Sequence, residues 1–270
     1  MAEITDCATS AVRGLSRQII AEMNLLIPGG ALVSIADLPI EATGSAVTLF
    51  LQPPAKEALR DAIRDRGGAT LRLSSAYRTV AQQFLLRRQF DQGRCGIPAA
   101  ARPGRSNHED GLALDTPDTN AWRQALEDNG WQWLGPGDRV HFSYAGAGTR
   151  EDLGTLGVRA FQRLWNRYHP TDRLTEDGEF GAQTASRLAS APADGFPPPR
   201  LLRLATPPLT GEDIRRVQEA LRTAGFPELP VTGIFGASTD SAVRAFQTRE
   251  QLAADGIVGM ATRRELGVLF

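Results

Sequence analysis

Three residues near the middle of the chain are of the types that hold a catalytic metal ion. His108 and Asp115 lie seven positions apart, and His141 follows them in the segment Asp-Arg-Val-His-Phe. The chain has only three histidines, and two of them fall in these short segments. Two imidazoles and one carboxylate can hold zinc and leave one coordination position open for water. Spacing alone also allows the plainer interpretation, ordinary polar residues of a loop and a strand.

The residues around this set predict how it is positioned. Gly111 and the alternation in residues 112–115 disfavour an unbroken helix between the first two candidates, so we expect a turn that carries His108 and a strand that delivers Asp115. In the later segment, His141 shares one strand face with Arg139 and Ser143, while apolar residues point to the other face. His141 is therefore expected on the polar side of a strand that can neighbour Asp115.

Composition limits the class of protein. The chain has 270 residues and a net charge of -1, which argues against a general nucleic-acid binder. It contains no apolar run of the ~18–20 residues that a membrane span needs. The first 24 residues carry interspersed charges and predict an amphipathic helix instead of a secretory signal. Cys7 and Cys95 are the only cysteines; they could pair in an oxidising compartment, but without a visible signal free thiols are favoured.

Residues 1–150 predict one α+β domain with a small antiparallel sheet. The expected helices are residues 53–66, about 79–92 with Thr79 as the cap, and 121–129, and the expected strands are 71–75, 112–115 and 139–144. Residues 94–105 contain two glycines and two prolines and predict a loop.

The rest of the chain contains an internal repeat. A helix that carries glutamine is followed by Asp/Thr-Gly-x-Phe/Val-Gly-x-x-Thr, at residues 177–184, 232–239 and 255–262. The glycines permit a tight turn, and the threonine is expected to cap the next helix. Six prolines within residues 191–208 indicate a semi-rigid linker. We therefore predict a diverged or half repeat at 151–190, the linker at 191–208 and an all-α module at 209–270.

The motif around the metal candidates resembles that of a known family. Ser-x-His-x-x-Gly-x-Ala-x-Asp at residues 106–115, an upstream Ser-Ala-Tyr-Arg-Thr at 75–79 and a later Asp-x-x-His at 138–141 resemble the VanY/VanX-type peptidases. These are zinc D-alanyl-D-alanine carboxypeptidases and L-alanyl-D-glutamate endopeptidases. The resemblance covers about residues 70–145. It implies that His108, Asp115 and His141 bind Zn²⁺.

The same resemblance assigns the general base to the residue three positions before the last histidine, which is Asp138. A carboxylate there can take a proton from water and pass it to the leaving amine. Strand alternation would put Asp138 on the wrong face, so we expect it in the turn before the strand. Glu109 and Asp110 are the competing carboxylates, and we expect both at the loop surface.

Two further residues are candidates for substrate binding. Arg78 could bind a substrate carboxylate or the negative charge that develops on the carbonyl oxygen. A surface salt bridge is its plainer alternative. Ser106 could hydrogen-bond the substrate or only shape the turn, and the sequence does not separate these two roles.

Residues 212–270 resemble the peptidoglycan-binding domain found on many wall hydrolases. Together the resemblances imply a monomeric zinc peptidase that cleaves peptidoglycan stem peptides, with removal of terminal D-alanine as the first reading. The alternatives are an L-alanyl-D-glutamate endopeptidase that uses the same site and a non-catalytic wall-binding protein. Action on the cell wall without a visible signal peptide leads us to expect release by phage lysis, an injection apparatus or cell lysis.

Overall fold

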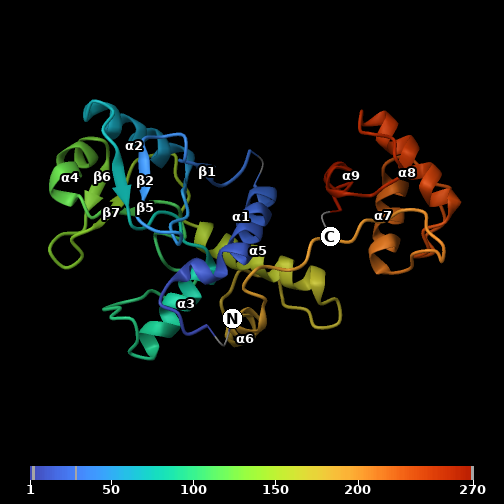
Figure 1. Cartoon of the computed structure of the whole chain (residues 1–270), viewed down its shortest axis with the longest axis horizontal. Helices are drawn as coiled ribbons and strands as arrows, with labels where there is room; N and C mark the ends of the chain where they lie inside the picture. Colours follow the sequence, from blue (N-terminus) through green and yellow to red (C-terminus); the bar gives the residue numbers. More distant parts are fainter. Residues whose placement is uncertain (2–3, 28, 269–270) are drawn as a thin grey trace. The chain divides into compact units, whose positions relative to one another are not determined.

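The computed structural model describes residues 1, 4–27 and 29–268, and it divides the chain into two compact units (Figure 1). The first unit runs from Met1 to Phe196 and the second from Pro197 to Phe270. The break between them falls within the predicted linker at residues 191–208. None of the helices in the described part of the chain is long and apolar enough to cross a membrane.

The first unit is a mixed α/β structure with small sheets, as the sequence predicts. Its helices are η1 (Thr9–Val12), α1 (Arg13–Leu26), α2 (Pro53–Asp65), α3 (Val80–Asp91), α4 (Thr119–Asp128), α5 (Leu153–Tyr168) and α6 (Ala182–Ser190). Its strands are β1 (Val33–Ser34), β2 (Ile40–Ala42), β3 (Phe50–Leu51), β4 (Leu71–Leu73), β5 (Ala113–Asp115), β6 (Trp131–Trp133) and β7 (His141–Tyr144). The helix expected within residues 1–24 begins later, at Thr9; residues 2 and 3 lie outside the described part of the chain.

Local sequence explains where the helices next to the site begin. The α2 helix starts at Pro53, where a missing backbone N–H costs nothing because the first turn leaves that donor unpaired. The α3 helix starts with the predicted cap, since Thr79 accepts a hydrogen bond from the Gln82 backbone and the Gln82 side chain bonds back to Thr79. This capping fixes the helix directly after Arg78, one of the candidate site residues.

The strands form a three-stranded sheet and two pairs. The sheet has the order β5-β7-β6 and is antiparallel throughout, as predicted. The pair β1–β3 is also antiparallel, whereas β2 and β4 are parallel, which the prediction of an antiparallel sheet did not include. A further bridge between Ser75 and Asp115 joins the end of β4 to β5. The candidate site residues therefore meet where β4, β5 and β7 come together.

Two apolar cores hold the first unit together. One lies between the strands and helices α2 and α4, and includes Leu114, Trp131 and Phe142. The other lies among α1, α3, α5 and α6, and includes Leu15, Phe161 and residues as far as Phe196. Figure 1 shows α5 running alongside α1. Residues 153–196 are thus packed into the first unit and share a core with its N-terminal helix.

The second unit is helical, as predicted, with α7 (Glu212–Thr223), α8 (Ala237–Arg249) and α9 (Met260–Glu265) around a core of its own. Two of the three repeats lie here. In each, a buried glutamine, Gln218 or Gln247, accepts the N–H of the turn glycine at 2.8–2.9 Å and donates to a carbonyl and a threonine hydroxyl at 3.0–3.1 Å. We call this arrangement the glutamine turn.

The first repeat contains the same glutamine turn, although it lies in the first unit. Gln162 accepts the N–H of Gly178 at 2.9 Å and donates to the Glu179 carbonyl and the Thr184 hydroxyl, each at 3.2 Å. Gly178 has φ +77, and a Cβ there would come within 2.6 Å of the Thr155 side chain. This position therefore needs glycine for both its backbone conformation and its space.

Two expectations from the sequence are wrong. The repeat threonines do not cap the following helices: the N-cap positions are Gly181, Gly236 and Gly259, and the threonine hydroxyls bond inward to the glutamine turn. Cys7 and Cys95 are not free thiols but form a disulfide. The end of α3 and the loop after it lie against the N-terminal segment: Gln89 donates to the Asp6 carbonyl at 2.6 Å, and Arg94 donates to the Thr5 carbonyl at 2.5 Å. These contacts flank the two cysteines.

Candidate metal centre

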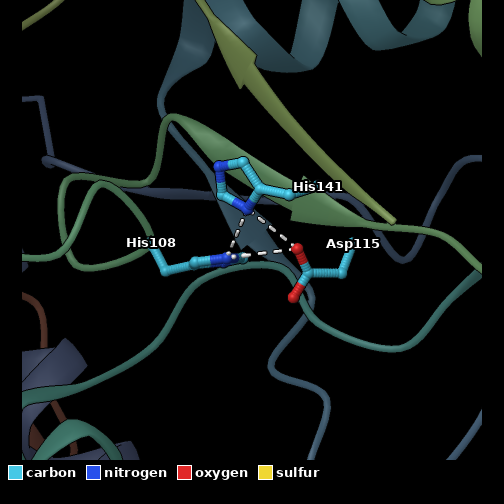
Figure 2. Close-up of side chains that lie close together, drawn as sticks. All are labelled: His108, Asp115 and His141. Carbon is cyan, nitrogen blue, oxygen red and sulfur yellow. Dashed lines mark hydrogen bonds and ion pairs between the residues drawn. The ribbon is translucent and has the colours of Figure 1, made fainter. Parts of the chain in front are cut away.

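The three metal candidates converge on one point (Figure 2). His141 Nδ1 lies 2.9 Å from Asp115 Oδ1 and 3.2 Å from His108 Nε2, and His108 Nε2 lies 3.4 Å from Asp115 Oδ1. Zinc bonds of about 2.0–2.1 Å in tetrahedral geometry place neighbouring ligand atoms about 3.3 Å apart. The triangle of donor atoms therefore has the size of one face of a zinc coordination tetrahedron, with the fourth position left for water or substrate.

Backbone structure explains this convergence. Asp115 on β5 is directly opposite His141 on β7 in the antiparallel register, so their side chains point to the same face. His108 comes from the turn before β5. That turn closes at Gly111, which has φ +66 and lies so close to Leu32 that a Cβ would come within 2.7 Å of it. The predicted turn followed by a strand is confirmed.

The ring of His108 is held in the orientation that a metal ligand needs. Its Nδ1 lies 2.7 Å from the Ala76 carbonyl oxygen, which can only accept, so the proton is on Nδ1 and the lone pair on Nε2 points into the cluster. His108 is 3% exposed. Burial, reinforced by the charge of Arg78, lowers its pKa, so the neutral, metal-binding form is favoured.

Asp115 supplies the negative charge of the cluster. Burial by itself raises the pKa of this carboxyl, but the neighbouring rings of both histidines and the charge of Arg78 outweigh burial and lower the pKa well below its usual range. The carboxylate is therefore ionised at any pH at which the protein works. Two neutral imidazoles and one carboxylate would leave a bound Zn²⁺ with a net charge of about +1, which favours Lewis-acid chemistry.

Arg78 is fastened beside the cluster. Its guanidinium donates to Gln83 at 3.2 Å and to Ser75 at 3.1 Å, and lies 3.5 Å from Asp115 Oδ2. Burial lowers the pKa of Arg78, and the nearby acidic groups of Asp115, Glu109 and Asp138 offset only part of this lowering. The side chain is 19% exposed, so a charged group held at a fixed position still faces solvent.

Asp138 lies in the turn between β6 and β7, as predicted. On the strand itself, alternation would point its side chain away from the face that carries His141. Its backbone carbonyl accepts the His141 N–H at 3.2 Å, which ties the turn to the ligand strand. The residue is exposed. Within residues 1, 4–27 and 29–268, its carboxylate has neither a hydrogen bond nor an ion pair.

The expectation that Glu109 and Asp110 lie at the loop surface is wrong. Glu109 is 1% exposed, and its carboxylate accepts the backbone N–H groups of Gly104 at 2.9 Å and Ser106 at 3.2 Å. Asp110 accepts the N–H of Gly154 at 2.9 Å. Gly104 and Ser106 lie in the irregular loop, and Gly154 lies in the first turn of α5, so none of these N–H groups has a strand or helix partner. The two carboxylates satisfy them. Burial raises the pKa of Glu109 to about 8.

Ser106 lies in the turn with only 7% of its surface exposed. Its N–H donates to Glu109 and its carbonyl accepts from Glu109 and Asp110, so it shapes the turn that carries His108. The sequence did not single out Asn107, whose amide reaches His141 and Ser143. The placement of Ser143 on the same strand face as His141 was the available signal for this contact.

Comparison with known proteins identifies two domains. A family model described as D-alanyl-D-alanine carboxypeptidase (VanY) matches residues 51–135, and one described as a putative peptidoglycan binding domain matches residues 210–266. The chain thus carries both domains that its motifs resemble. The first match includes His108 and Asp115 and ends before Asp138 and His141; the fold brings His141 to the other two ligands.

Two curated proteins are similar over parts of the chain. The zinc D-Ala-D-Ala carboxypeptidase of Streptomyces albus G is 46% identical over 57 residues, which cover 20% of this chain and 22% of that protein. The N-acetylmuramoyl-L-alanine amidase CwlL of Bacillus licheniformis is 27% identical over 144 residues, which cover 47% of this chain and 38% of that protein. The chain therefore spans well under half the length of these relatives.

Proposed function

We propose that the chain is a zinc-dependent peptidoglycan peptidase, in which the first unit cleaves stem peptides and the second binds the wall polymer. The observation that carries this proposal is the triangle of His108, Asp115 and His141, whose edges of 2.9–3.4 Å fit a zinc ion with an open position. The carboxypeptidase model that matches residues 51–135 supports the same chemistry.

His108, Asp115 and His141 would hold the ion. When bound, zinc would act as a Lewis acid that polarises the scissile carbonyl and lowers the pKa of the attacking water. Asp138 acts as the general base: its exposed carboxylate takes a proton from the attacking water and passes it to the leaving amine. Glu109 and Asp110 are occupied by backbone N–H groups, which leaves Asp138 as the free carboxylate next to a ligand.

Arg78 would bind negative charge on the substrate. Gln83 and Ser75 hold its guanidinium from one side, so the group is oriented before substrate arrives. A fixed guanidinium can pair with the terminal carboxylate of a stem peptide or with the developing oxyanion. We retain Ser106 as a second substrate contact, although its observed bonds serve the turn.

We propose release of terminal D-alanine as the primary reaction. The description of the matching family model and the name of the Streptomyces relative, both D-Ala-D-Ala carboxypeptidases, support cleavage of this bond. Cleavage between L-alanine and D-glutamate is the second candidate, which the aspartate at position 138 favours because several endopeptidases of this type carry aspartate there. A non-catalytic wall-binding protein fits less well, because all three metal donors are present and in register.

Metal analysis and product analysis test this proposal together. We expect about one zinc per purified chain, and mass spectrometry of digested peptidoglycan should show either free D-alanine or stem peptides cut after L-alanine. The first product identifies a carboxypeptidase and the second an endopeptidase. A chain that binds no zinc and stays inactive when zinc is added would contradict the enzyme proposal and leave wall binding as the function.

The peptidoglycan-binding domain implies that the protein acts at the cell wall, outside the cytoplasm. The Cys7–Cys95 disulfide fits such an oxidising location. We propose that a monomer reaches the wall by phage lysis, an injection apparatus or lysis of the producing cell. Fractionation of a culture before and after lysis would show which of these routes operates.

A further inference from the structure

His141 presents its two ring nitrogens to different surroundings. Nδ1 faces the metal cluster, 2.9 Å from Asp115 Oδ1 and 3.2 Å from His108 Nε2. Nε2 points the other way and lies 3.0 Å from the Ser143 hydroxyl and 3.0 Å from Nδ2 of the Asn107 side-chain amide. The same Nδ2 donates to the Ser143 hydroxyl at 2.7 Å. Ring, hydroxyl and amide thus form a closed triangle behind the metal-facing nitrogen.

The chemistry of imidazole decides how protons are placed in this triangle. A nitrogen that binds a metal must offer a lone pair, so Nδ1 is unprotonated and Nε2 carries the hydrogen. The Nε2–H then needs an acceptor. Turning the Asn107 amide over by about 180° exchanges Nδ2 for Oδ1, two atoms that only the hydrogen-bond network distinguishes. Oδ1 then accepts the Nε2–H, and it can also accept the Ser143 hydroxyl proton. In that orientation no two donors of the triangle face each other.

We propose that Asn107 and Ser143 are positioning residues that hold His141 in its zinc-binding tautomer. This inference rests on the proposed zinc function. Asn107 is next to His108 in the chain, so its contact with β7 also links the turn of one ligand to the strand of another. Partners of this kind, which hydrogen-bond the distal nitrogen of a ligand histidine, typically change metal affinity by about 10–100-fold when they are removed.

The two ligand histidines differ in how they are held. His108 donates to a backbone carbonyl, that of Ala76, which no side-chain substitution removes. The distal nitrogen of His141 contacts only side chains among the described residues, and one of them, Asn107, is exposed. An exposed side chain can be replaced with little effect on the fold. The orientation of His141 is therefore open to test by substitution.

The test measures zinc affinity of the full chain by competition with a chelator, independently of catalysis. We expect Asn107→Leu and Ser143→Ala each to weaken zinc binding by about 10–100-fold. Asn107→Asp should bind zinc at least as tightly as the wild type, because a carboxylate is a stronger acceptor for Nε2–H. Asn120→Leu, the same change at an exposed asparagine of α4, is the matched control and should leave the affinity unchanged.

Nitrogen-15 spectra of the histidine rings in zinc-loaded protein give a second readout. Wild type and Asn107→Asp should show a His141 Nε2 proton that is protected from exchange with water, and Asn107→Leu should show this proton exchanging faster. Zinc affinity of Asn107→Leu and Ser143→Ala within twofold of wild type would overturn the inference and leave the proposed function intact. A wild-type chain that binds no zinc would overturn both.

Discussion

The same glutamine turn occurs in both units, and its surroundings differ. In the second unit, the turns at Gln218 and Gln247 pack within one small helical core that includes Phe235 and Phe246. In the first unit, the turn at Gln162 packs against a different helix. Phe180, which lies in this turn, contacts Phe84 of α3 with ring centroids 6.1 Å apart. The hydrogen bonds within each turn are nevertheless alike.

The conformation of the glutamine turn and the packing around it have different causes. The turn itself is set by local sequence, a buried glutamine, a glycine with positive φ and a threonine. What the turn supports is set by the elements against which it packs. In the first unit it supports α5, which lies along α1 and α3 behind the metal centre. In the second unit it supports the module that matches a peptidoglycan-binding domain. Substitutions should therefore affect one unit at a time.

The largest expected effect is the loss of one metal donor. His108→Ala removes a vertex of the triangle, so we expect zinc binding to fall below detection and hydrolysis to drop at least about 1,000-fold, since the metal contributes several kcal/mol to the reaction. Cosedimentation with insoluble peptidoglycan should be unchanged, because the second unit is intact. Loss of sedimentation in this variant would show that the wall-binding function depends on the first unit.

Asp138→Ala should remove catalysis without removing the metal. We expect hydrolysis to fall about 100- to 10,000-fold, the usual contribution of a general base, while zinc content stays at the wild-type level. Asp138→Glu, which keeps the carboxylate, should recover part of the rate. If Asp138→Ala retains full activity, another group transfers the proton and the assignment of the base is wrong.

Replacing the glutamine in each unit tests the comparison directly. Gln162→Leu and Gln247→Leu each leave a buried glycine N–H without its acceptor, and we expect each to destabilise its own unit by about 1–3 kcal/mol. Gln162→Leu should lower zinc affinity and hydrolysis. Gln247→Leu should reduce wall binding while leaving cleavage of a soluble stem peptide unchanged. Calorimetry of both variants measures the loss.

Gln132→Leu, at an exposed position of β6, is the control for these two variants and should leave both units at wild-type stability. If Gln162→Leu and Gln247→Leu lower the stability of both units equally, the units are not independent and the comparison fails.

The smallest expected effect depends on pH. Glu109 has a folded pKa of about 8, above the usual unfolded value of about 4.3, so the native state binds the extra proton. Stability from this group is fully present below about pH 4.3 and is lost as pH rises to 8. In zinc-free protein, the lowered pKa of His108 has the opposite effect, but only up to about pH 6.5.

Thermal unfolding of the zinc-free protein between pH 6.5 and 8 isolates the contribution of Glu109. We expect the first unit of the wild type to lose about 2 kcal/mol over this range. Glu109→Gln has no ionisable side chain at this position, so its first unit should not lose this stability between pH 6.5 and 8. Parallel curves for the two proteins would contradict the raised pKa of Glu109.

Periodicity and motif spacing predicted the parts of the site that lie on regular structure. Asp115 and His141 could be placed because alternation assigns each a strand face, and the register puts them opposite one another. Glu109 could not be placed, since its burial depends on which N–H groups of the irregular loop lack partners. Composition left a Cys7–Cys95 pair open, but their proximity could not be predicted, since 88 positions separate them and the N-terminal segment has no motif of its own.

The packing of α5 against α1 has a practical consequence for anyone who shortens this protein. A chain cut after residue 150 would keep every residue of the metal centre but would expose the apolar face of α1, including Leu15 and Ile19. It would also remove both partners of Glu22, a 2% exposed carboxylate that accepts from Arg163 at 2.8 Å and Arg167 at 2.6 Å. Such a fragment should aggregate, whereas one ending at residue 196 retains the complete core.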